Sequence, residues 1–96
     1  MPDYDFKTTF WSDFSIADLF GVDAIEDTFK RAFDAWKTNV EYLAELVLVL
    51  NWKGWQWYGK NADKAKTYFD LYEQADGWAC DNLSEDDMRY YFSVTD

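Results

Sequence analysis

The stretch VEYLAELVLVLNWKGWQWY, residues 40–58, is the most apolar part of the chain, and it decides the fold. Its apolar residues recur at alternating spacings of four and three, which is the period of one face of an α-helix. Further apolar residues lie on either side of this stripe, as is typical of a helix buried nearly all round. The stripe, with one residue upstream, consists of Trp36, Val40, Leu43, Val47, Leu50, Gly54 and Trp57.

A β-hairpin is the alternative interpretation of the same stretch. In it, LVLVL forms one strand, residues 51–54 form the turn, and WQWY forms the returning strand. The apolar pattern extends over about 19 residues, which is too long for one strand and favours the helix. Gly54 counts against the helix, because Gly costs about 1 kcal/mol relative to Ala in a helix interior.

The segments before this stretch contain an aromatic-rich arm and two signals for the start of a helix. Residues 1–14 have no helical period but several aromatic residues, so we expect an extended N-terminal arm packed on the helices. Ser15 is a candidate N-cap, and Gly21 is a candidate stop, which predicts a short helix over residues 15–20. Asp23 opens a second helical stripe that runs into the central stretch without Gly or Pro.

The connection at residues 37–39 leaves two structures open. A single long or kinked helix over residues 23–58 would be about 54 Å long at 1.5 Å per residue. Alternatively, the chain breaks there, and Thr38 with Glu41 forms a capping box. We favour the long helix, because the sequence holds no strong breaker at this point.

The C-terminal part predicts an antiparallel return. Gly59-Lys60-Asn61 is a turn, with Asn61 as the N-cap of a helix over residues 61–82. Ser84 opens a last short helix over residues 84–92, followed by a loose tail. The sequence therefore predicts one all-α domain over residues 1–96: an aromatic-rich antiparallel helical pair or three-helix bundle, with short terminal helices and an N-terminal arm.

The charge distribution limits the classes of molecule that the chain is expected to bind. The 96 residues carry a net charge of −10, with acidic ends around a mildly basic middle. This balance argues against direct binding to nucleic acid or to an anionic membrane, and it permits a basic protein surface. The sequence has no secretory signal pattern and no apolar run long enough to cross a bilayer, so we expect a cytoplasmic protein.

Catalytic chemistry finds little support, so we predict no enzyme activity, no cofactor and no metal. The chain has no histidine and a single cysteine, Cys80, which we interpret as a small core residue. The acidic segment DNLSEDD, residues 81–87, lacks the spacing of a calcium loop. Glu41 and Glu45 are the nearest approach to a catalytic carboxylate pair, and we expect them to be partners of Lys37 and other bases.

The candidate interaction patch is aromatic and consists of Trp52, Trp55, Trp57 and Tyr58. Three tryptophans at these positions cannot all face one side of a helix, so part of the set should be exposed. Trp and Tyr are favoured residues at protein interfaces. Lys53 and Lys60 flank the patch in sequence, and this mixed charge suits a protein partner better than a glycan.

A second surface follows from the long helix. The helix over residues 61–82 is too short to cover the whole long helix. The first half of the long helix would therefore leave an apolar face for another chain. We therefore predict a symmetric homodimer if the helix is continuous, and a monomer if it breaks. The candidate dimer contact consists of Phe29, Phe33 and Trp36.

The order of FSIADLFG, AFDAWK, YLAELVLVLNWK with WQWY, ADGWACDNL and a closing Tyr-Tyr-Phe resembles a small family associated with conjugative and other mobile elements of gut Gram-positive bacteria. The likeness covers about residues 8–96, and Gly54 departs from the bulky residue expected there. The family has no established activity. The resemblance implies a mobile-element setting, and our leading hypothesis is a non-catalytic acidic protein-binding accessory. A narrower version is an inhibitor of a host defence system that acts by nucleic-acid mimicry. The alternative is a small-molecule or glycan-binding module that uses the tryptophan patch.

Overall fold

The computed structural model describes residues 6–95, with side chains from Thr9 onward. Helices account for nearly all of this part of the chain, and it holds no strand, which confirms the all-α prediction and excludes the hairpin. The helices are α1 (Phe6–Phe20), α2 (Val22–Trp36), α3 (Val40–Trp57), α4 (Ala62–Asn82) and α5 (Glu85–Thr95).

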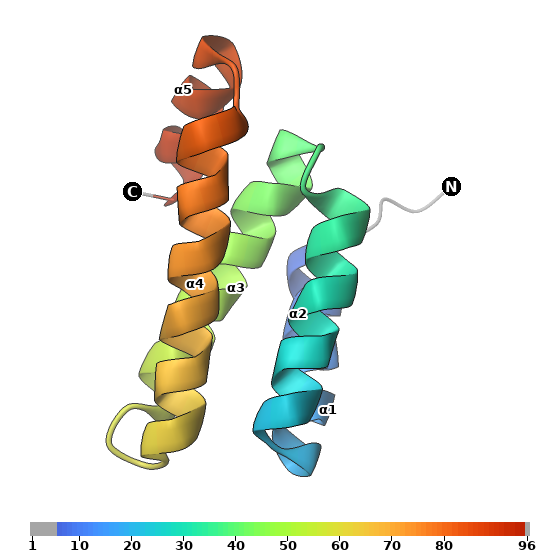
Figure 1. The fold of residues 1–96 in the computed structure, drawn as a ribbon, viewed down its shortest axis with the longest axis vertical. Helices are drawn as coiled ribbons and strands as arrows, with labels where there is room; N and C mark the ends of the chain where they lie inside the picture. The colour runs from blue at the N-terminus through green and yellow to red at the C-terminus, as the bar shows by residue number, and fades with distance from the viewer. Residues whose placement is uncertain (1–5, 96) are drawn as a thin grey trace.

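The helices form two layers. α2 and α4 lie side by side in front, and α1 and α3 lie behind them (Figure 1). α5 turns back from the end of α4 and packs against α3. The described residues extend over 37 × 32 × 20 Å. The shortest dimension fits two layers of helices, each about 10 Å thick.

α3 is the central helix, as the apolar residues on nearly all of its sides predict. Leu43, Leu46, Val47, Val49 and Leu50 are fully buried. The remaining helices pack around it, and α4 runs antiparallel to it after the turn at Gly59, whose φ is 80°. The Asn61 side chain accepts a hydrogen bond from the Lys64 backbone N–H at 3.1 Å, which confirms the predicted cap of α4.

The prediction of one continuous helix over residues 23–58 is wrong. The chain breaks after Trp36, and Asn39 in extended conformation caps α3. Its side-chain oxygen accepts hydrogen bonds from the backbone N–H groups of Glu41 and Tyr42 at 3.1 and 3.4 Å. A short polar side chain before an apolar helix start is thus enough to break the chain without Gly or Pro. The sequence-based alternative placed this break correctly but assigned the cap to Thr38.

The predicted extended arm is helical from Phe6, and residues 1–5 lie outside the described part. Ser15 therefore lies inside α1 instead of capping a short helix, whereas Gly21 does end α1, with a φ of 112°. α1 carries apolar residues on opposite faces, with Phe10, Phe14 and Ala17 buried and Ile16, Leu19 and Phe20 exposed. This two-sided pattern hides the helical period from sequence reasoning.

The C-terminus also differs from its prediction, because Ser93–Thr95 continue α5 instead of forming a loose tail, and Asp96 is outside the described part. The Ser84 cap is confirmed, since its hydroxyl accepts a hydrogen bond from the Asp87 backbone N–H at 3.2 Å.

The predicted dimer contact is covered within the chain. Phe29 and Phe33 are only 3% and 7% exposed, and their rings stack at 5.2 Å. Trp78 of α4 lies edge-on to Phe33 at 5.7 Å, and Trp36 lies edge-on to Tyr42 at 4.8 Å. Because the chain folds back at residues 37–39, it covers the apolar face that the continuous helix would have left open.

Candidate functional site

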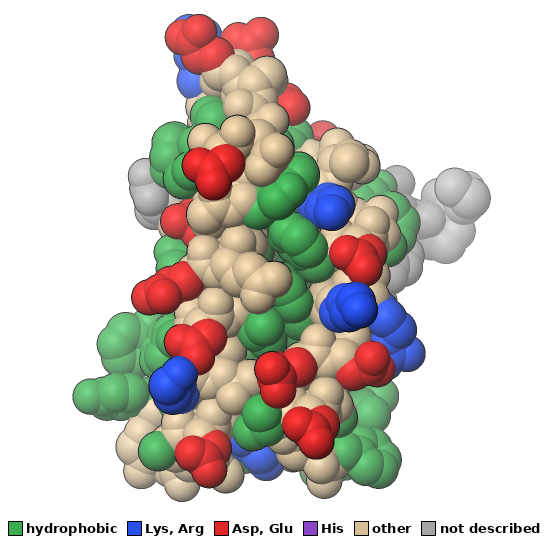
Figure 2. All heavy atoms as spheres, viewed as in Figure 1, with side chains coloured by type: hydrophobic (Ala, Val, Ile, Leu, Met, Phe, Trp, Pro, Cys, Tyr) green, Lys and Arg blue, Asp and Glu red, His purple; other side chains and the backbone are tan. Residues whose placement is uncertain are grey.

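An aromatic cluster of Trp55, Tyr58 and Phe69 lies at the end of the molecule where α3 passes into α4. The Trp55 ring lies 5.3 Å from that of Tyr58 and 5.3 Å from that of Phe69, in both cases edge-on. Trp55 is 60% exposed and Tyr58 is 66% exposed. Hydrophobic side chains project from the edge of the molecule beside this turn (Figure 2).

Gly54 holds the cluster in place. A β-carbon at this position would lie 2.5–2.8 Å from three atoms of the Phe69 ring, closer than any packing allows. The missing side chain therefore lets Phe69 lie directly on the backbone of α3, and Phe69 in turn supports Trp55. The residue that argued against a helix in the sequence is the one that positions the exposed aromatics.

The other two residues of the predicted patch lie elsewhere. Trp52 is partly exposed, and its ring meets that of Trp11 on α1 edge-on at 6.2 Å. Trp57 is mostly buried and lies under the ammonium group of Lys64, 4.5 Å from the ring centroid. Its indole Nε1 is buried without a hydrogen-bond partner. The structure thus brings together Trp55 and Tyr58, separates Trp52 and Trp57 from them, and adds Phe69.

Lys53, expected at the rim of the patch, is 1% exposed. Its ammonium group contacts the Asp18 carboxylate at 2.8 Å and the Ser15 hydroxyl at 2.9 Å, and it lies 4.7 Å from the centroid of the Trp11 ring. The Tyr68 hydroxyl donates to the other Asp18 oxygen. These residues form a buried polar cluster of Ser15, Asp18, Lys53 and Tyr68 that joins α1, α3 and α4.

The buried polar cluster is built to hold helices together. Both carboxylate oxygens of Asp18 are engaged, and the Lys64 ammonium donates to its backbone carbonyl at 2.6 Å. Burial and the hydrogen bond to Asp18 raise the pKa of Tyr68 far above its ordinary value, so its hydroxyl stays protonated. Asp18, Lys53 and Tyr68 are buried and bonded to one another within the fold, which separates this cluster from the exposed one.

A hollow of about 370 Å³ lies beside the aromatic cluster. Its lining is mostly apolar and includes Tyr58, Ala62, Ala65 and Phe69. Two charged residues also line it, and the Lys66 ammonium contacts the Asp70 carboxylate at 2.6 Å. The hollow therefore offers apolar contact area with a single ion pair at its side.

The remaining sequence candidates do not form a site. Cys80, expected in the core, is exposed. Desolvation and the nearby carboxylates of Asp76 and Asp81 raise the pKa of its thiol, which disfavours the reactive thiolate. Lys37, the expected partner of Glu41 and Glu45, lies over the rings of Phe33 and Trp78 instead. No group of three or more potential metal ligands exists among the described residues.

Acidic residues outnumber basic ones in the chain, 19 to 9. Acidic side chains lie over α2 and α4 on both sides of a strip of hydrophobic side chains (Figure 2). Several cations are neutralised by acids, as in the pairs Arg31–Asp27, Lys66–Asp70 and Arg89–Glu85. Lys53 is also buried in an ion pair with Asp18, so three cations of the basic middle of the sequence are neutralised within the chain.

Comparison with protein-family models, with curated proteins and with solved structures finds no match for this chain. Within residues 6–95, none of the helices has the length and apolar character needed to cross a membrane.

Proposed function

We propose that this chain is a non-catalytic protein-binding module whose contact surface is centred on the aromatic cluster. The observation that carries the proposal is the exposure of Trp55 and Tyr58 on a support fixed by Gly54 and Phe69. Trp and Tyr dominate binding energy at protein interfaces. Anchors that are already ordered bind with a smaller loss of conformational entropy than flexible ones.

The acidic surface favours a partner with a basic face. With a net charge of −10 and several of its cations paired within the chain, the protein attracts such a partner over long range. The narrower form of the proposal is that the chain acts in the cytoplasm as an accessory of a mobile element. There it would inhibit a host defence enzyme by occupying its nucleic-acid site with carboxylates.

The test compares a variant of the aromatic cluster with a control variant on another helix. Trp55→Ser with Tyr58→Ser alters the cluster, whereas Phe92→Ser alters an exposed aromatic residue on α5. Peptides selected for binding to the wild-type chain should lose at least tenfold in affinity for the cluster variant and less than twofold for Phe92→Ser. Equal losses in the two variants would reject the cluster as the binding surface.

The mimicry form has its own readout. A partner protein with DNA or RNA bound to it should release the nucleic acid when this chain is added. The rate at which this chain associates with the partner should fall steeply with salt. Formation of a ternary complex with the nucleic acid would reject mimicry while leaving protein binding in place.

A small-molecule ligand is the second candidate, favoured by the hollow beside Tyr58. Its volume of about 370 Å³ lies within the ordinary range of ligand pockets, and its apolar lining suits an aromatic ligand better than a glycan. A fragment screen by NMR tests it: ligands should shift the signals of Ala62, Ala65 and Phe69. Binding of oligosaccharides instead would point to the glycan version.

A further inference from the structure

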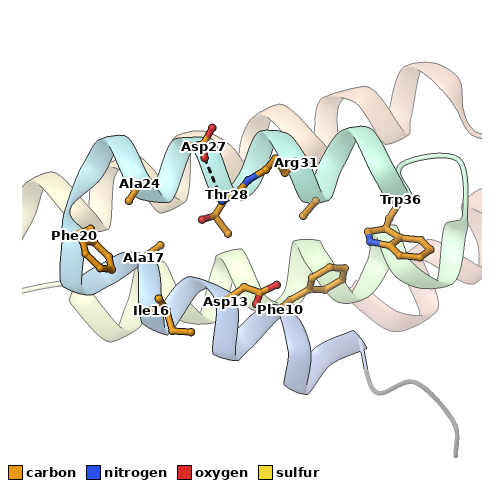
Figure 3. Close-up of a pocket in the computed structure, with 11 residues that line it drawn as sticks. Phe10, Asp13, Ile16, Ala17, Phe20, Ala24, Asp27, Thr28, Arg31 and Trp36 are labelled. Atoms are coloured by element: carbon orange, nitrogen blue, oxygen red, sulfur yellow. Dashed lines mark ion pairs between the residues drawn. The ribbon is translucent and has the colours of Figure 1, made fainter.

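A groove runs between α1 and α2 on a part of the molecule that the aromatic cluster does not occupy. The two helices are antiparallel, because only Gly21 separates them, and the groove between them has a volume of about 480 Å³. The side chains of Phe10 and Trp36 lie at one end of it, and Phe20 and Ala24 lie at the other (Figure 3).

The groove is lined by polar and apolar surface in similar amounts, and several of its residues are small. Ala17 of α1 and Ala24, Thr28 and Ala32 of α2 line it. Ile16 and Phe20 line its α1 side and are 58% and 79% exposed. Large exposed apolar side chains beside a row of small ones form a surface that gains free energy when a partner covers it.

The size of the groove fits one helix of the partner. From Ala24 to Trp36 it runs for about 18 Å, roughly three turns of an α-helix. Apolar side chains at positions i, i+3, i+4 and i+7 of an amphipathic helix lie along one face and match such a groove.

The charges select a basic helix. Asp13 of α1 lies between the two helices, and Asp27 of α2 pairs with Arg31 at 3.2 Å (Figure 3). The charged lining residues thus carry a negative balance within a chain of net charge −10. A second copy of this chain would bring the same charge and be repelled, whereas a helix with Lys or Arg beside its apolar face is attracted.

We infer that the groove between α1 and α2 is a second docking surface, and that it binds a basic amphipathic helix of a partner protein. This surface is independent of the aromatic cluster, so a chain that uses both could hold two protein segments at once. The apolar face of the helix covers Ile16 and Phe20, and one of its cations reaches Asp13.

The probe is a synthetic 14-residue leucine–lysine amphipathic helix, with a leucine–glutamate peptide of the same apolar pattern as its counterpart. Fluorescence anisotropy of the labelled peptides with the full chain should show binding at least tenfold tighter for the lysine peptide. Amide shifts in the NMR spectrum should lie in α1 and α2. Equal affinity of the two peptides, or shifts confined to other helices, would overturn the inference.

Matched variants separate the groove from general attraction to an acidic protein. Phe20→Ser should lower the affinity for the lysine peptide at least fivefold, whereas Phe92→Ser on α5 should change this affinity less than twofold. Asp13→Asn should weaken binding more than Glu73→Gln, which makes the same change in net charge on α4. Equal effects within either pair contradict the groove.

Two further measurements distinguish this inference from the proposed function and from self-association. Trp55→Ser should leave peptide binding unchanged, and a loss there would move the site to the aromatic cluster. Sedimentation equilibrium of the chain alone should give 11.4 kDa. A dimer that Phe20→Ser dissociates would show that a second copy, and not a basic helix, occupies the groove.

Discussion

Lys53 and Trp55 are two residues apart on α3, and their environments are the reverse of what their side chains suggest. The lysine is 1% exposed and the tryptophan is 60% exposed. The lysine is buried where Asp18 and Ser15 of α1 accept hydrogen bonds from its ammonium group. Gly54 lets Phe69 pack against one side of the tryptophan ring, and much of the ring remains exposed. One helix thus carries a buried polar residue that joins it to α1 and an aromatic side that is exposed.

The largest expected effect comes from breaking the buried ion pair. Asp18→Ala leaves the Lys53 ammonium buried without its carboxylate, which should lower the free energy of unfolding by about 3–5 kcal/mol. Trp55→Ser removes only exposed ring contacts and should cost about 0.5–1.5 kcal/mol. Urea denaturation followed by circular dichroism measures both.

The comparison fails if the two variants lose similar amounts of stability. Lys53→Met combined with Asp18→Leu sharpens it, because replacing a buried ion pair by apolar residues of similar size is often neutral. Recovery of most of the lost stability in this double variant would identify the unpaired charge, and not lost packing, as the cause.

The second prediction concerns the support of the aromatic side. Gly54→Ala should destabilise the chain by about 1–3 kcal/mol, because the new methyl group forces Phe69 off α3. Gly77→Ala on α4 is the matched control, since a β-carbon there meets nothing. It should instead stabilise the chain by up to about 1 kcal/mol through helix propensity. If both changes stabilise, Phe69 does not rest on Gly54.

The third prediction concerns pH. Burial and hydrogen bonds to Asp18 and Asp76 raise the pKa values of Tyr68 and Tyr91 in the folded chain far above those in the unfolded chain. The unfolded chain therefore releases these protons first, at about pH 10. Stability is fully present below that pH and should fall above it, by up to about 1.4 kcal/mol per pH unit for each tyrosine.

Urea unfolding at pH 9, 10 and 11 measures this decline. Tyr68→Phe lowers stability at neutral pH but removes one of the two buried tyrosine hydroxyl groups, so its decline with pH should be shallower. A wild-type stability that stays flat to pH 11 would contradict the burial of these two hydroxyl groups.

The sequence predicts those helices that have a single apolar stripe and a recognisable N-cap residue. The helix over residues 62–82 and its cap Asn61 follow directly from the turn and the stripe, as does the central position of α3. α1 escapes prediction because it is apolar on two faces, so no single stripe stands out. The break before α3 depends on Asn39, whose side chain accepts a hydrogen bond from the backbone N–H of Glu41. Asparagine also occurs inside helices, so its presence in the sequence does not by itself predict a break.

The candidate site was predicted in part. Trp55 and Tyr58 follow from the local density of aromatic residues, but Phe69 comes from another helix, and only Gly54 signals its approach. The burial of Lys53 depends on Asp18, 35 positions away in the chain. Such long-range pairs leave no periodic signal, and the residues of the α1–α2 groove were hidden for the same reason.

Hydroxyl-radical footprinting with mass spectrometry compares the exposed aromatic cluster with the buried polar cluster in one sample of the native chain. We expect rapid oxidation of Trp55 and Tyr58 and strong protection of Tyr68, which is fully buried beside Asp18. Protection of Trp55 to the level of Tyr68 in the isolated chain, or oxidation of Tyr68 at the rate of Tyr58, would contradict the contrast between the exposed cluster and the buried one.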